Sequence, residues 1–522
     1  MTRIKRRDLI GLITVSISLT IPDRFSMVRL ARGCLAIVLF VLAISFAQTG
    51  TDAAPAVAGV QRRALPLNHF HYADDGILSG EPSANWHRMA VGIADDYFDG
   101  TSDPSRVRRH FQVAKQLGVR YLRCAFSWNG IEKTPGKYEW AFWDNLVAEA
   151  DRAGIELIPY VAYTPEWAAN KHEMFWAEPP RDVTLYAAFM SKIVSRYRGK
   201  IHAWEIWNEP DNAEYWKGSV EEYADLVRRT AVAMRRADPE TVLVLGGMSR
   251  GPGEFFRELI SKDVIGEYVD VIAMHAYPET WDEERLETIY KDWIDQMKYL
   301  ISRDAPGSDF WINEMGYSDY RYRPNQATKW GIHAYYNYEH TAEYQANFLF
   351  KAEVMSLTSP QVSLTAWYRI DDFSPSRTHF SQDQANYHLG LVDAEGKPKP
   401  AFRALKFFRK ILGQPVQRLN WQGEKDSQAE IVLFRRADNR IVFAAWLRSS
   451  RADEVDEGNG MERDHRKERV AIEVPCNKGS ELQMFDSEGR RVRSSVKLRN
   501  RELRSVVLNG QGVVVGVMGC EK

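Results

Sequence analysis

Residues 203–211 read Ala-Trp-Glu-Ile-Trp-Asn-Glu-Pro-Asp, a short apolar run that stops at the carboxylate Glu209 and a proline. Its length and its turn-forming end are typical of a buried β-strand. A second run, residues 310–316, reads Phe-Trp-Ile-Asn-Glu-Met-Gly and stops at the carboxylate Glu314. In a barrel of parallel strands, the carboxyl ends of all strands meet at one open face. The two runs therefore predict a place where acidic side chains meet.

Similar apolar runs alternate with amphipathic segments from about Trp86 to Gly413. Many of the runs are continuously apolar, as expected for strands that are buried on both faces of a parallel sheet. About eight strand–helix units over about 300 residues predict a (β/α)8 TIM barrel. An open, doubly wound sheet is the alternative, but no Gly-x-Gly-x-x-Gly motif follows the first strand. The expected strands are 89–93, 121–126, 156–162, 203–207, 242–246, 269–275, 310–313 and 364–368, and the expected helices are 104–117, 140–153, 183–198, 220–237 and 341–357.

The pattern of the sequence changes after Gly413, from alternating strands and helices to short strands. Short strands with turn residues between them, such as Asn509-Gly510, predict a C-terminal antiparallel β-sandwich. The charged stretch 451–469 is expected to be a solvated, mobile loop. The expected domains are 1–54 for an N-terminal extension, signal peptide and linker, 60–413 for the barrel, and 414–522 for the sandwich. The expected sandwich strands are 431–434, 441–446, 470–474, 482–485, 492–498 and 513–517.

The N-terminal region has the three parts of a signal peptide. Arg29 and Arg32 precede an apolar run from Cys34 to Phe46, and Ser45-Phe46-Ala47 offers a cleavage site with small flanking residues. The run is shorter than the about 20 residues that a membrane span requires. We therefore expect an exported protein, periplasmic or extracellular. An uncleaved anchor remains the alternative, because residues 9–21 form a second apolar stretch.

Charge and cysteine content limit the possible partners. The formal net charge is -1, so nucleic acid is not expected as a partner. The sequence contains no His/Cys cluster and no HExxH motif, and neither a metal nor a cofactor is indicated. Cys476 and Cys520 could pair in an oxidising compartment, whereas Cys124 fits a small buried side chain. The 16 Trp and 23 Tyr residues fit either stacking on sugar rings or a Trp-rich core.

Glu209 and Glu314 together suggest a chemistry. Strands four and seven lie on roughly opposite sides of a barrel mouth, so their carboxylates can bracket one bond. Glycoside hydrolysis needs two such groups, one protonated and one ionised, about 5–5.5 Å apart in retaining enzymes. A single strand-end glutamate is more often part of a salt bridge. Two of them, one within Asn-Glu-Pro, favour the catalytic interpretation.

At these positions the chain resembles clan A of the glycoside hydrolases, whose catalytic glutamates follow strands four and seven. The stretch 204–211 looks like the acid/base motif of the clan, and the nearest resemblance is to family 39, with family 5 next. It extends over roughly residues 60–522. The resemblance implies a retaining glycosidase that acts on an oligo- or polysaccharide, with Glu209 as acid/base and Glu314 as nucleophile.

The resemblance also implies roles for residues around the two glutamates. Asn208 is similar to the asparagine that binds the 2-hydroxyl group of the sugar. His275 and Tyr277 end strand six and resemble the pair that lines the subsite and orients the nucleophile. A hydrogen bond donated by the Tyr277 hydroxyl, or the charge of Arg123, would keep Glu314 ionised. A buried ion pair elsewhere in the barrel is the alternative for Arg123.

Aromatic residues at other strand ends are expected to contact the sugar. Trp367 resembles the aromatic floor under the sugar that is cleaved. Trp128, Trp167 and Tyr163 are candidates for further stacking platforms, with loop packing as the alternative for each. Asp371-Asp372 and His388 follow strand eight, and each could be a sugar contact or a solvated loop residue.

Glu205 is a carboxylate within strand four. Strand alternation would point Glu205, Trp207 and Glu209 in the same direction, into the barrel. A buried carboxylate there needs a partner, for which Arg123 is the candidate.

Three alternatives to hydrolysis remain open. A transglycosylase would use the same residues with a sugar as acceptor. A catalytically dead carbohydrate-binding barrel would require the two glutamates to be misplaced in space. A surface scaffold would make the sandwich the functional part, although the sandwich looks more like a structural appendage. For an exported enzyme with an aromatic cleft, we expect endo action on a polymer such as an exopolysaccharide. We also expect a monomer, and contact with a membrane only through the signal or anchor.

Overall fold

The computed structural model describes residues 86–97, 103–171, 173–323, 331–373, 383–420, 427–476, 481–493, 496, 498–499, 502–510 and 512–519. The chain separates into two units, Met1–Ala58 and Gly59–Lys522. The expected signal peptide and linker, residues 1–54, lie outside the described residues. Among the helices that are described, none is long and apolar enough to cross a membrane.

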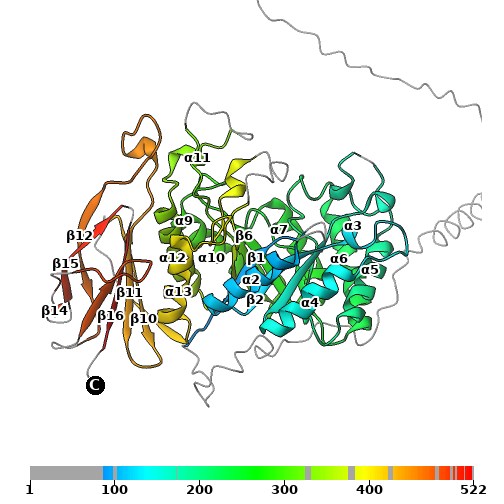
Figure 1. The fold of residues 1–522 in the computed structure, drawn as a ribbon, viewed down its shortest axis with the longest axis horizontal. Coiled ribbons are helices and arrows are strands. Elements are labelled where there is room, and N and C mark those ends of the chain that lie inside the picture. The colour runs from blue at the N-terminus through cyan, green and yellow to red at the C-terminus, as the bar shows by residue number, and fades with distance from the viewer. Residues whose placement is uncertain are drawn as a thin grey trace, which may run out of the picture. The chain divides into compact units, whose positions relative to one another are not determined.

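In the described part of the chain, eight parallel strands close into a barrel in sequence order, and β8 pairs with β1 (Figure 1). This confirms the predicted (β/α)8 barrel, and each strand lies within a few residues of its expected position. The barrel strands are β1 (Ala90–Asp95), β2 (Tyr121–Ser127), β3 (Glu156–Ala162), β4 (Ala203–Ile206), β5 (Val242–Leu245), β6 (Val271–Ala276), β7 (Asp309–Met315) and β8 (Val362–Tyr368).

Helices follow the strands, and several of them begin or end at residues that cap them. Asp103 accepts a hydrogen bond from the Ser105 amide at the start of α2 (Pro104–Leu117), and Gly118 ends this helix with a φ of 68°. Ser219 and Glu222 form a capping box at the start of α6 (Val220–Ala237). The remaining α-helices are α3 (Trp128–Ile131), α4 (Ala141–Ala153), α5 (Val183–Arg196), α7 (Glu254–Ile260), α8 (Asp263–Tyr268), α9 (Leu286–Thr288), α10 (Ile294–Asp304), α11 (Ala334–Asn337), α12 (Ala342–Leu357) and α13 (Pro400–Leu412).

Alternate residues of the strands pack on opposite sides of the barrel wall. Ala203, Val242 and Trp311 belong to a buried cluster of inward-facing residues. Their neighbours Trp204 and Leu243 belong to a larger cluster that joins the wall to the surrounding helices. This alternation gives the barrel wall two hydrophobic layers, one inside the barrel and one under the helices.

The C-terminal region contains two antiparallel sheets, with strand orders β13-β16-β11-β10-β9 and β12-β15-β14 among the described residues. The predicted antiparallel sandwich is therefore confirmed. The expectation missed β9 and β15, and the strand expected at 492–498 is wrong in its described residues, since β14 begins only at Leu498. The strands are β9 (Val416–Leu419), β10 (Ala429–Arg436), β11 (Ile441–Leu447), β12 (Lys467–Glu473), β13 (Leu482–Phe485), β14 (Leu498–Arg499), β15 (Glu502–Asn509) and β16 (Val513–Met518).

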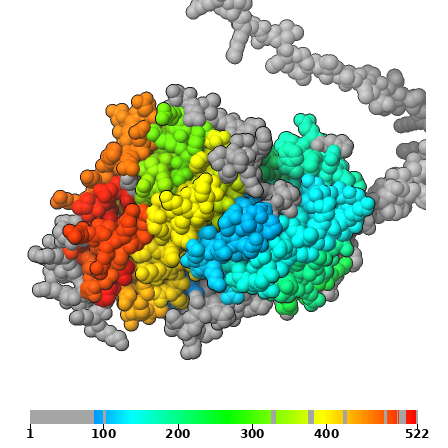
Figure 2. Space-filling model, viewed as in Figure 1, coloured from blue at the N-terminus to red at the C-terminus, as the bar shows by residue number. Residues whose placement is uncertain are grey.

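The sandwich packs on the barrel through α12 and α13, which lie beside its larger sheet (Figures 1 and 2). Trp446 is fully buried, and its indole Nε1 donates to Glu287 Oε1 of the barrel across 2.9 Å. The charged stretch 451–469 is a solvated loop only in part: residues such as Asp453 and Glu462 are exposed, but Met461 and Asp464 are buried and β12 begins at Lys467. Its polar groups find partners within the fold, such as the Asp464 amide, which donates to Glu339.

The two cysteines in the described part of the chain differ in their bonding state. Cys124 is free and buried, as expected. Burial raises the pKa of its thiol well above the ordinary value, which keeps it protonated. Cys476 is disulfide-bonded. Cys520, its expected partner, lies outside the described residues.

Candidate active site

A cavity of about 690 Å³ opens at the carboxyl ends of the barrel strands. Its walls carry both predicted catalytic glutamates together with several aromatic rings. The described residues that line it are Asp96, Tyr160, Tyr163, Asn208, Glu209, Asn212, Glu214, Tyr215, Ser249, Arg250, Tyr277, Trp281, Asp282, Glu314, Ile332, Tyr368, Asp383 and Asn386.

Glu209 lies just beyond β4, where the chain leaves the strand. Its backbone is in the left-handed region, with a φ of 44°, and its amide donates to the Gly247 carbonyl across 3.1 Å. This conformation is rare for a non-glycine residue and is held by its surroundings. Burial raises the pKa of the Glu209 carboxyl most, and the charge of Glu314 raises it further, whereas His275 works in the opposite direction. The balance keeps Glu209 protonated to a higher pH than an ordinary glutamate.

Glu314 is on β7, and strong donors face both of its oxygens. Arg123 Nη1 donates to Oε2 across 2.5 Å, and the Tyr277 hydroxyl donates to Oε1 across 2.6 Å. Burial opposes ionisation of this carboxyl, but His275, Arg123 and Tyr277 outweigh it and hold its pKa below the ordinary value. Glu314 is therefore the ionised member of the pair.

His275, on β6, lies between the two carboxylates. Its Nδ1 is 2.7 Å from Glu209 Oε1 and 3.8 Å from Glu314 Oε1. One oxygen of each glutamate and the histidine nitrogen all lie within 4.8 Å of one another. Burial lowers the pKa of His275, but the neighbouring carboxylates outweigh this and raise it. A positive charge on His275 is thus shared by the two glutamates.

Gly247 makes room for this histidine. A Cβ atom at this position would overlap His275 Nε2 and would lie 2.9 Å from Asn313 Oδ1. Both contacts are closer than packed side chains allow. The glycine after β5 is therefore required for the position of His275.

Arg123 on β2 connects Glu314 to a buried polar network inside the barrel. Its Nε and Nη2 donate to the two oxygens of Glu205 across 2.7 and 2.9 Å, which confirms the expected pairing. Nη2 also donates to Asn208 Oδ1 across 2.6 Å, and Asn313 Nδ2 donates to Glu205. Every oxygen of the buried Glu205 thus has a charge-assisted partner. The network fixes Arg123 beneath Glu314.

The chain breaks strand alternation immediately after β4. Glu205 points into the barrel as expected, but Trp207 does not follow it. With a φ of 73°, Trp207 turns into the outer core and packs against Trp216 and Tyr186. The expectation assumed a strand through residue 207, whereas β4 ends at Ile206.

Trp367 is not the floor of the cavity. It is fully buried in the layer outside the barrel wall, where its ring contacts Phe348 and its Nε1 donates to the Leu389 carbonyl. The next residue, Tyr368, lines the cavity instead. Successive strand residues point to opposite faces, so the expectation was wrong by one position.

Trp128 and Trp167 pack in the β2 and β3 loops rather than along the cavity. Trp128 is fully buried, and the two indole rings meet edge to face at 5.9 Å. Both indole N–H groups donate to Glu132, at its side chain and its carbonyl respectively. The alternative of loop packing is therefore correct, and Tyr163 is the β3-loop ring that lines the cavity.

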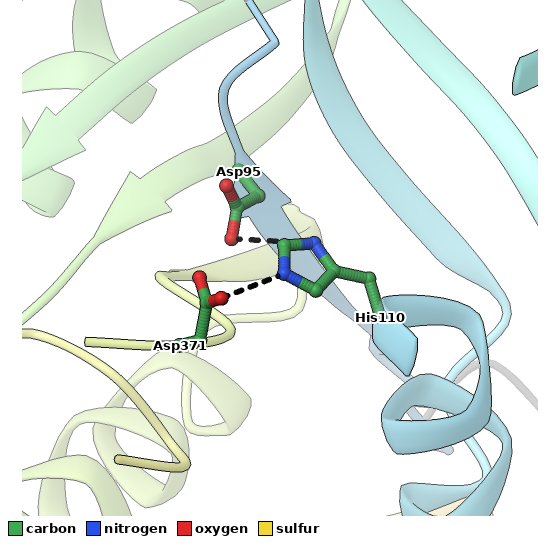
Figure 3. A group of neighbouring side chains, drawn as sticks. All are labelled: Asp95, His110 and Asp371. Atoms are coloured by element: carbon green, nitrogen blue, oxygen red, sulfur yellow. Dashed lines mark ion pairs between the residues drawn. The ribbon is translucent and has the colours of Figure 1, made fainter. Parts of the chain in front are cut away.

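Asp371 belongs to an ion-pair cluster beside the cavity. Figure 3 shows His110 of α2 between Asp95, at the end of β1, and Asp371, beyond β8. His110 Nε2 is 3.1 Å from Asp371 Oδ2, and the Arg106 and Arg369 guanidiniums contact both aspartates. The two guanidiniums already balance the negative charge of the two aspartates, so the cluster does not need a metal ion. The cluster ties β1 to the β8 loop.

Asp372 and His388 also contact protein groups. Lys399 Nζ lies 3.0 Å from Asp372 Oδ2 and 2.9 Å from Asp319 Oδ2. The His388 ring stacks on Tyr320. Neither Asp372 nor His388 is among the residues that line the cavity with the two glutamates. Asp372 and His388 instead line a separate cavity of about 310 Å³, so the sugar contacts considered for them lie outside the cavity that holds the two glutamates.

Several lining residues were not expected from the sequence. Asp96 follows β1, and Tyr160 lies within β3. Trp281 and Asp282 follow Tyr277 on the β6 loop, and Asp383 accepts a hydrogen bond from Trp281 Nε1 across 3.0 Å. Asp96 carried a usable signal, since it is a polar residue at the end of an apolar run. The loop residues carried none, because their direction depends on tertiary packing.

Comparison with known proteins agrees with this geometry. A family model described as "Glycosyl hydrolases family 39" matches residues 138–483. The chain is 24% identical over 260 residues to a beta-xylosidase of Caldicellulosiruptor saccharolyticus, which covers 46% of this chain and 49% of that protein. It is 26% identical over 214 residues to endo-1,4-beta-xylanase 3 of Hypocrea jecorina, which covers 37% and 59%. The chain thus spans only about half the length of these curated relatives.

Among solved structures, the fold is similar to that of a family 39 glycoside hydrolase from Bacteroides cellulosilyticus WH2. The TM-score is 0.62 at 15% identity, and the match covers 83% of this chain and 81% of the other. At this identity the likeness shows the fold alone. The family match, by contrast, spans well over half of the sequence and includes the region of both glutamates. The chain therefore belongs to family 39 of the glycosyl hydrolases.

Proposed function

We propose that this chain is a retaining glycoside hydrolase that cleaves a β-linked oligo- or polysaccharide. Glu209 is its acid/base and Glu314 its nucleophile. The observation that supports this most strongly is the approach of the two carboxylates, with one oxygen of each within 4.8 Å. Retaining enzymes hold these groups about 5–5.5 Å apart, whereas inverting enzymes leave about 6.5–9.5 Å for a water molecule. Membership of family 39 supports the same chemistry.

In the first step, ionised Glu314 attacks the anomeric carbon and forms a covalent ester with the sugar. Glu209 donates its proton to the glycosidic oxygen, and the bond between that oxygen and the anomeric carbon breaks. The opposite pKa shifts of the two carboxyls prepare both roles in the free protein. Arg123 and Tyr277 hold Glu314 in place for the attack.

In the second step, Glu209 takes a proton from water, and the oxygen of that water displaces Glu314 from the anomeric carbon. Formation of the ester removes the negative charge of Glu314, which lowers the pKa of Glu209 and suits it to act as a base. Two inversions give net retention. Asn208, fixed by Arg123, lines the cavity where it can bind the 2-hydroxyl group.

The cavity favours a substrate longer than one sugar. Its volume of about 690 Å³ exceeds what a single pyranose ring fills, and it lies within the usual range for ligand sites. The aromatic residues that line it are Tyr160, Tyr163, Tyr215, Tyr277, Trp281 and Tyr368. We infer endo action on a polymer, such as an exopolysaccharide.

Hydrolysis and retention are tested together. The purified protein is incubated with a panel of β-linked polysaccharides, and new reducing ends are measured. Proton NMR then records the anomer that forms first, before mutarotation. We expect a β-anomer from a β-linked substrate, and an α-anomer as the first product contradicts the proposal. Products longer than the donor in the presence of added acceptor sugar would assign transglycosylation instead.

A dead binding barrel makes a separate prediction. It would bind a polysaccharide without releasing reducing ends, and Glu209→Gln would then change neither property. The opposite pKa shifts of the paired carboxyls favour the catalytic function.

We further infer that the protein is exported and monomeric. The charged and apolar residues at 29–47 support export, because they have the order of a signal peptide. Cell fractionation and size-exclusion chromatography test the two inferences. Activity confined to the cytoplasm, or elution as a dimer, contradicts the respective one.

A further inference from the structure

Asp96 is a further carboxylate in the cavity, close enough to Glu314 for the charge of Glu314 to raise its pKa. It lies directly after β1, and its side chain accepts one hydrogen bond on each oxygen. The Tyr160 hydroxyl donates to Oδ1 across 2.7 Å, and the Tyr368 hydroxyl donates to Oδ2 across 2.8 Å. A carboxylate can accept about four hydrogen bonds, so both oxygens retain capacity for a ligand. Both tyrosines and Asp96 line the cavity beside Glu314.

The backbone of Asp96 is fixed by the ion-pair cluster of Figure 3. The Asp96 amide donates to Asp95 Oδ1 across 2.8 Å, and the Ile370 amide donates to Asp95 Oδ2 across 3.1 Å. Arg106 and Arg369 hold the same Asp95 carboxylate. The cluster therefore fixes the end of β1 against the chain that follows Tyr368. Asp96 and its donor Tyr368 are thus parts of one rigid structure.

The charges around Asp96 determine which ligands it can accept. Burial and the charge of Glu314 raise its pKa to about 6, so it is mostly ionised at neutral pH. Among the lining residues that are described, six are acidic (Asp96, Glu209, Glu214, Asp282, Glu314 and Asp383), and the one cation is Arg250. A carboxylate on the bound sugar would lie close to Asp96 and Glu314 in a partly desolvated site, where like charges repel strongly. Hydroxyl and ammonium groups are favoured there.

We propose that Asp96 binds hydroxyl or ammonium donors of the sugar that occupies the site of Glu314, and so restricts the enzyme to sugars without a carboxylate there. Neutral and amino sugars fit this site, and uronic acids do not. The proposal rests on the proposed hydrolase function, because that function places the sugar against Glu314.

The test compares sugars that differ only in their charge. Hydrolysis of 4-nitrophenyl β-D-glucoside and β-D-galactoside is compared with that of the matching glucuronide and galacturonide, in the wild type and in Asp96→Asn. We expect the wild type to prefer the neutral member of each pair. Asp96→Asn should lower kcat/KM for the neutral sugars about 10- to 100-fold, because a charge-assisted hydrogen bond is lost. It should leave the hydrolysis of the uronides unchanged or make it faster, so that the ratio of kcat/KM between the neutral sugars and the uronides falls.

Binding to polymers tests the same point for an endo-acting enzyme. The Glu209→Gln variant, which mimics the protonated acid, is run in gels that contain xylan, glucomannan, chitosan or polygalacturonate. We expect retardation by at least one neutral or amino polymer and none by polygalacturonate. Addition of Asp96→Asn should weaken the former retardation and reduce the discrimination. Glu254→Gln removes one charge at an exposed position of α7 and is the matched control, with no effect in either assay.

Three results overturn the inference. The first is retardation by polygalacturonate, or uronide hydrolysis, that equals or exceeds that of the neutral partner. The second is an Asp96→Asn variant that keeps the wild-type preference within about twofold. In both cases retaining hydrolysis can stand, so the failure concerns Asp96 alone. The third is the absence of hydrolysis and retardation with every probe, which overturns the proposed hydrolase function together with the inference.

Discussion

His275 Nδ1 lies 2.7 Å from Glu209 Oε1, and its charge acts on both Glu209 and Glu314. Burial raises the pKa of Glu209, and His275 lowers it again by hydrogen bond and charge. The same histidine is the largest of the influences that lower the pKa of Glu314. One imidazole thus influences both carboxyls that the proposed reaction requires.

Replacing His275 by asparagine should move the pH profile. Without the positive charge, the pKa of Glu314 and that of Glu209 both rise. The acid limb of kcat/KM reports the ionised nucleophile and the alkaline limb reports the protonated acid, so both limbs should shift to higher pH. His388→Asn, outside the cavity, is the control and should leave both limbs in place. Unchanged limbs in His275→Asn would remove the histidine from this role.

Gly247→Ala should impair catalysis through a single methyl group. The added Cβ would overlap His275 Nε2, so the imidazole must leave its position beside Glu209 and Glu314. A displacement of about 1 Å in an active site can cost about 100-fold in rate, and we expect a loss of kcat/KM of that order. In Gly253→Ala the nearest atom to the new Cβ is 3.9 Å away, and activity should stay within about twofold. Equal activities of the two variants would show that His275 tolerates the displacement.

Arg123→Met should destabilise the barrel and also slow the reaction. It leaves the fully buried Glu205 without its guanidinium, which typically costs about 3–5 kcal/mol of unfolding free energy. Adding Glu205→Gln removes the uncompensated charge, so the double variant should be more stable than Arg123→Met. Urea unfolding of the two single variants and the double variant measures this coupling. Strictly additive losses would contradict the buried pair.

Glu353 should make stability depend on pH. Burial in α12 raises the pKa of this carboxyl from 4.5 to about 8. Between these values the folded protein keeps a proton that the unfolded chain releases, so stability falls as the pH rises, by up to about 1.4 kcal/mol per unit. Glu353→Gln cannot ionise, so its stability relative to wild type should increase from pH 5 to pH 8 in urea unfolding. The exposed Glu343→Gln on the same helix is the control, and a pH-independent difference for Glu353→Gln would contradict the shift.

The sequence predicted the barrel and the position of the two glutamates because both depend on local pattern. The run at 203–206 and the run at 309–315 are strands buried on both faces, and such strands show as continuous apolar segments. A carboxylate at the end of each is visible without tertiary information. Helix α2 was predicted to the residue, since Asp103, Pro104 and Gly118 mark its ends.

The aromatic wall could not be predicted in the same way. Trp367 and Tyr368 are adjacent, and which of them faces the cavity depends on the register of β8, which the sequence does not reveal. Trp128 and Trp167 follow strands as Tyr163 does, yet a contact between their own rings takes them out of the cavity. Asp96 has the same strand-end signal as the two glutamates, but it was not singled out because it belongs to no motif such as Asn-Glu-Pro.

The configuration of the azide product formed by Glu314→Ala tests the central assignment most directly. An activated β-glycoside is incubated with this variant, which should be inactive alone and should recover turnover when sodium azide is added. Azide then enters from the face that the carboxylate has vacated, and NMR should identify an α-glycosyl azide, inverted relative to the substrate. A β-glycosyl azide would show that the missing group is the acid/base, and would reverse the roles given to Glu209 and Glu314.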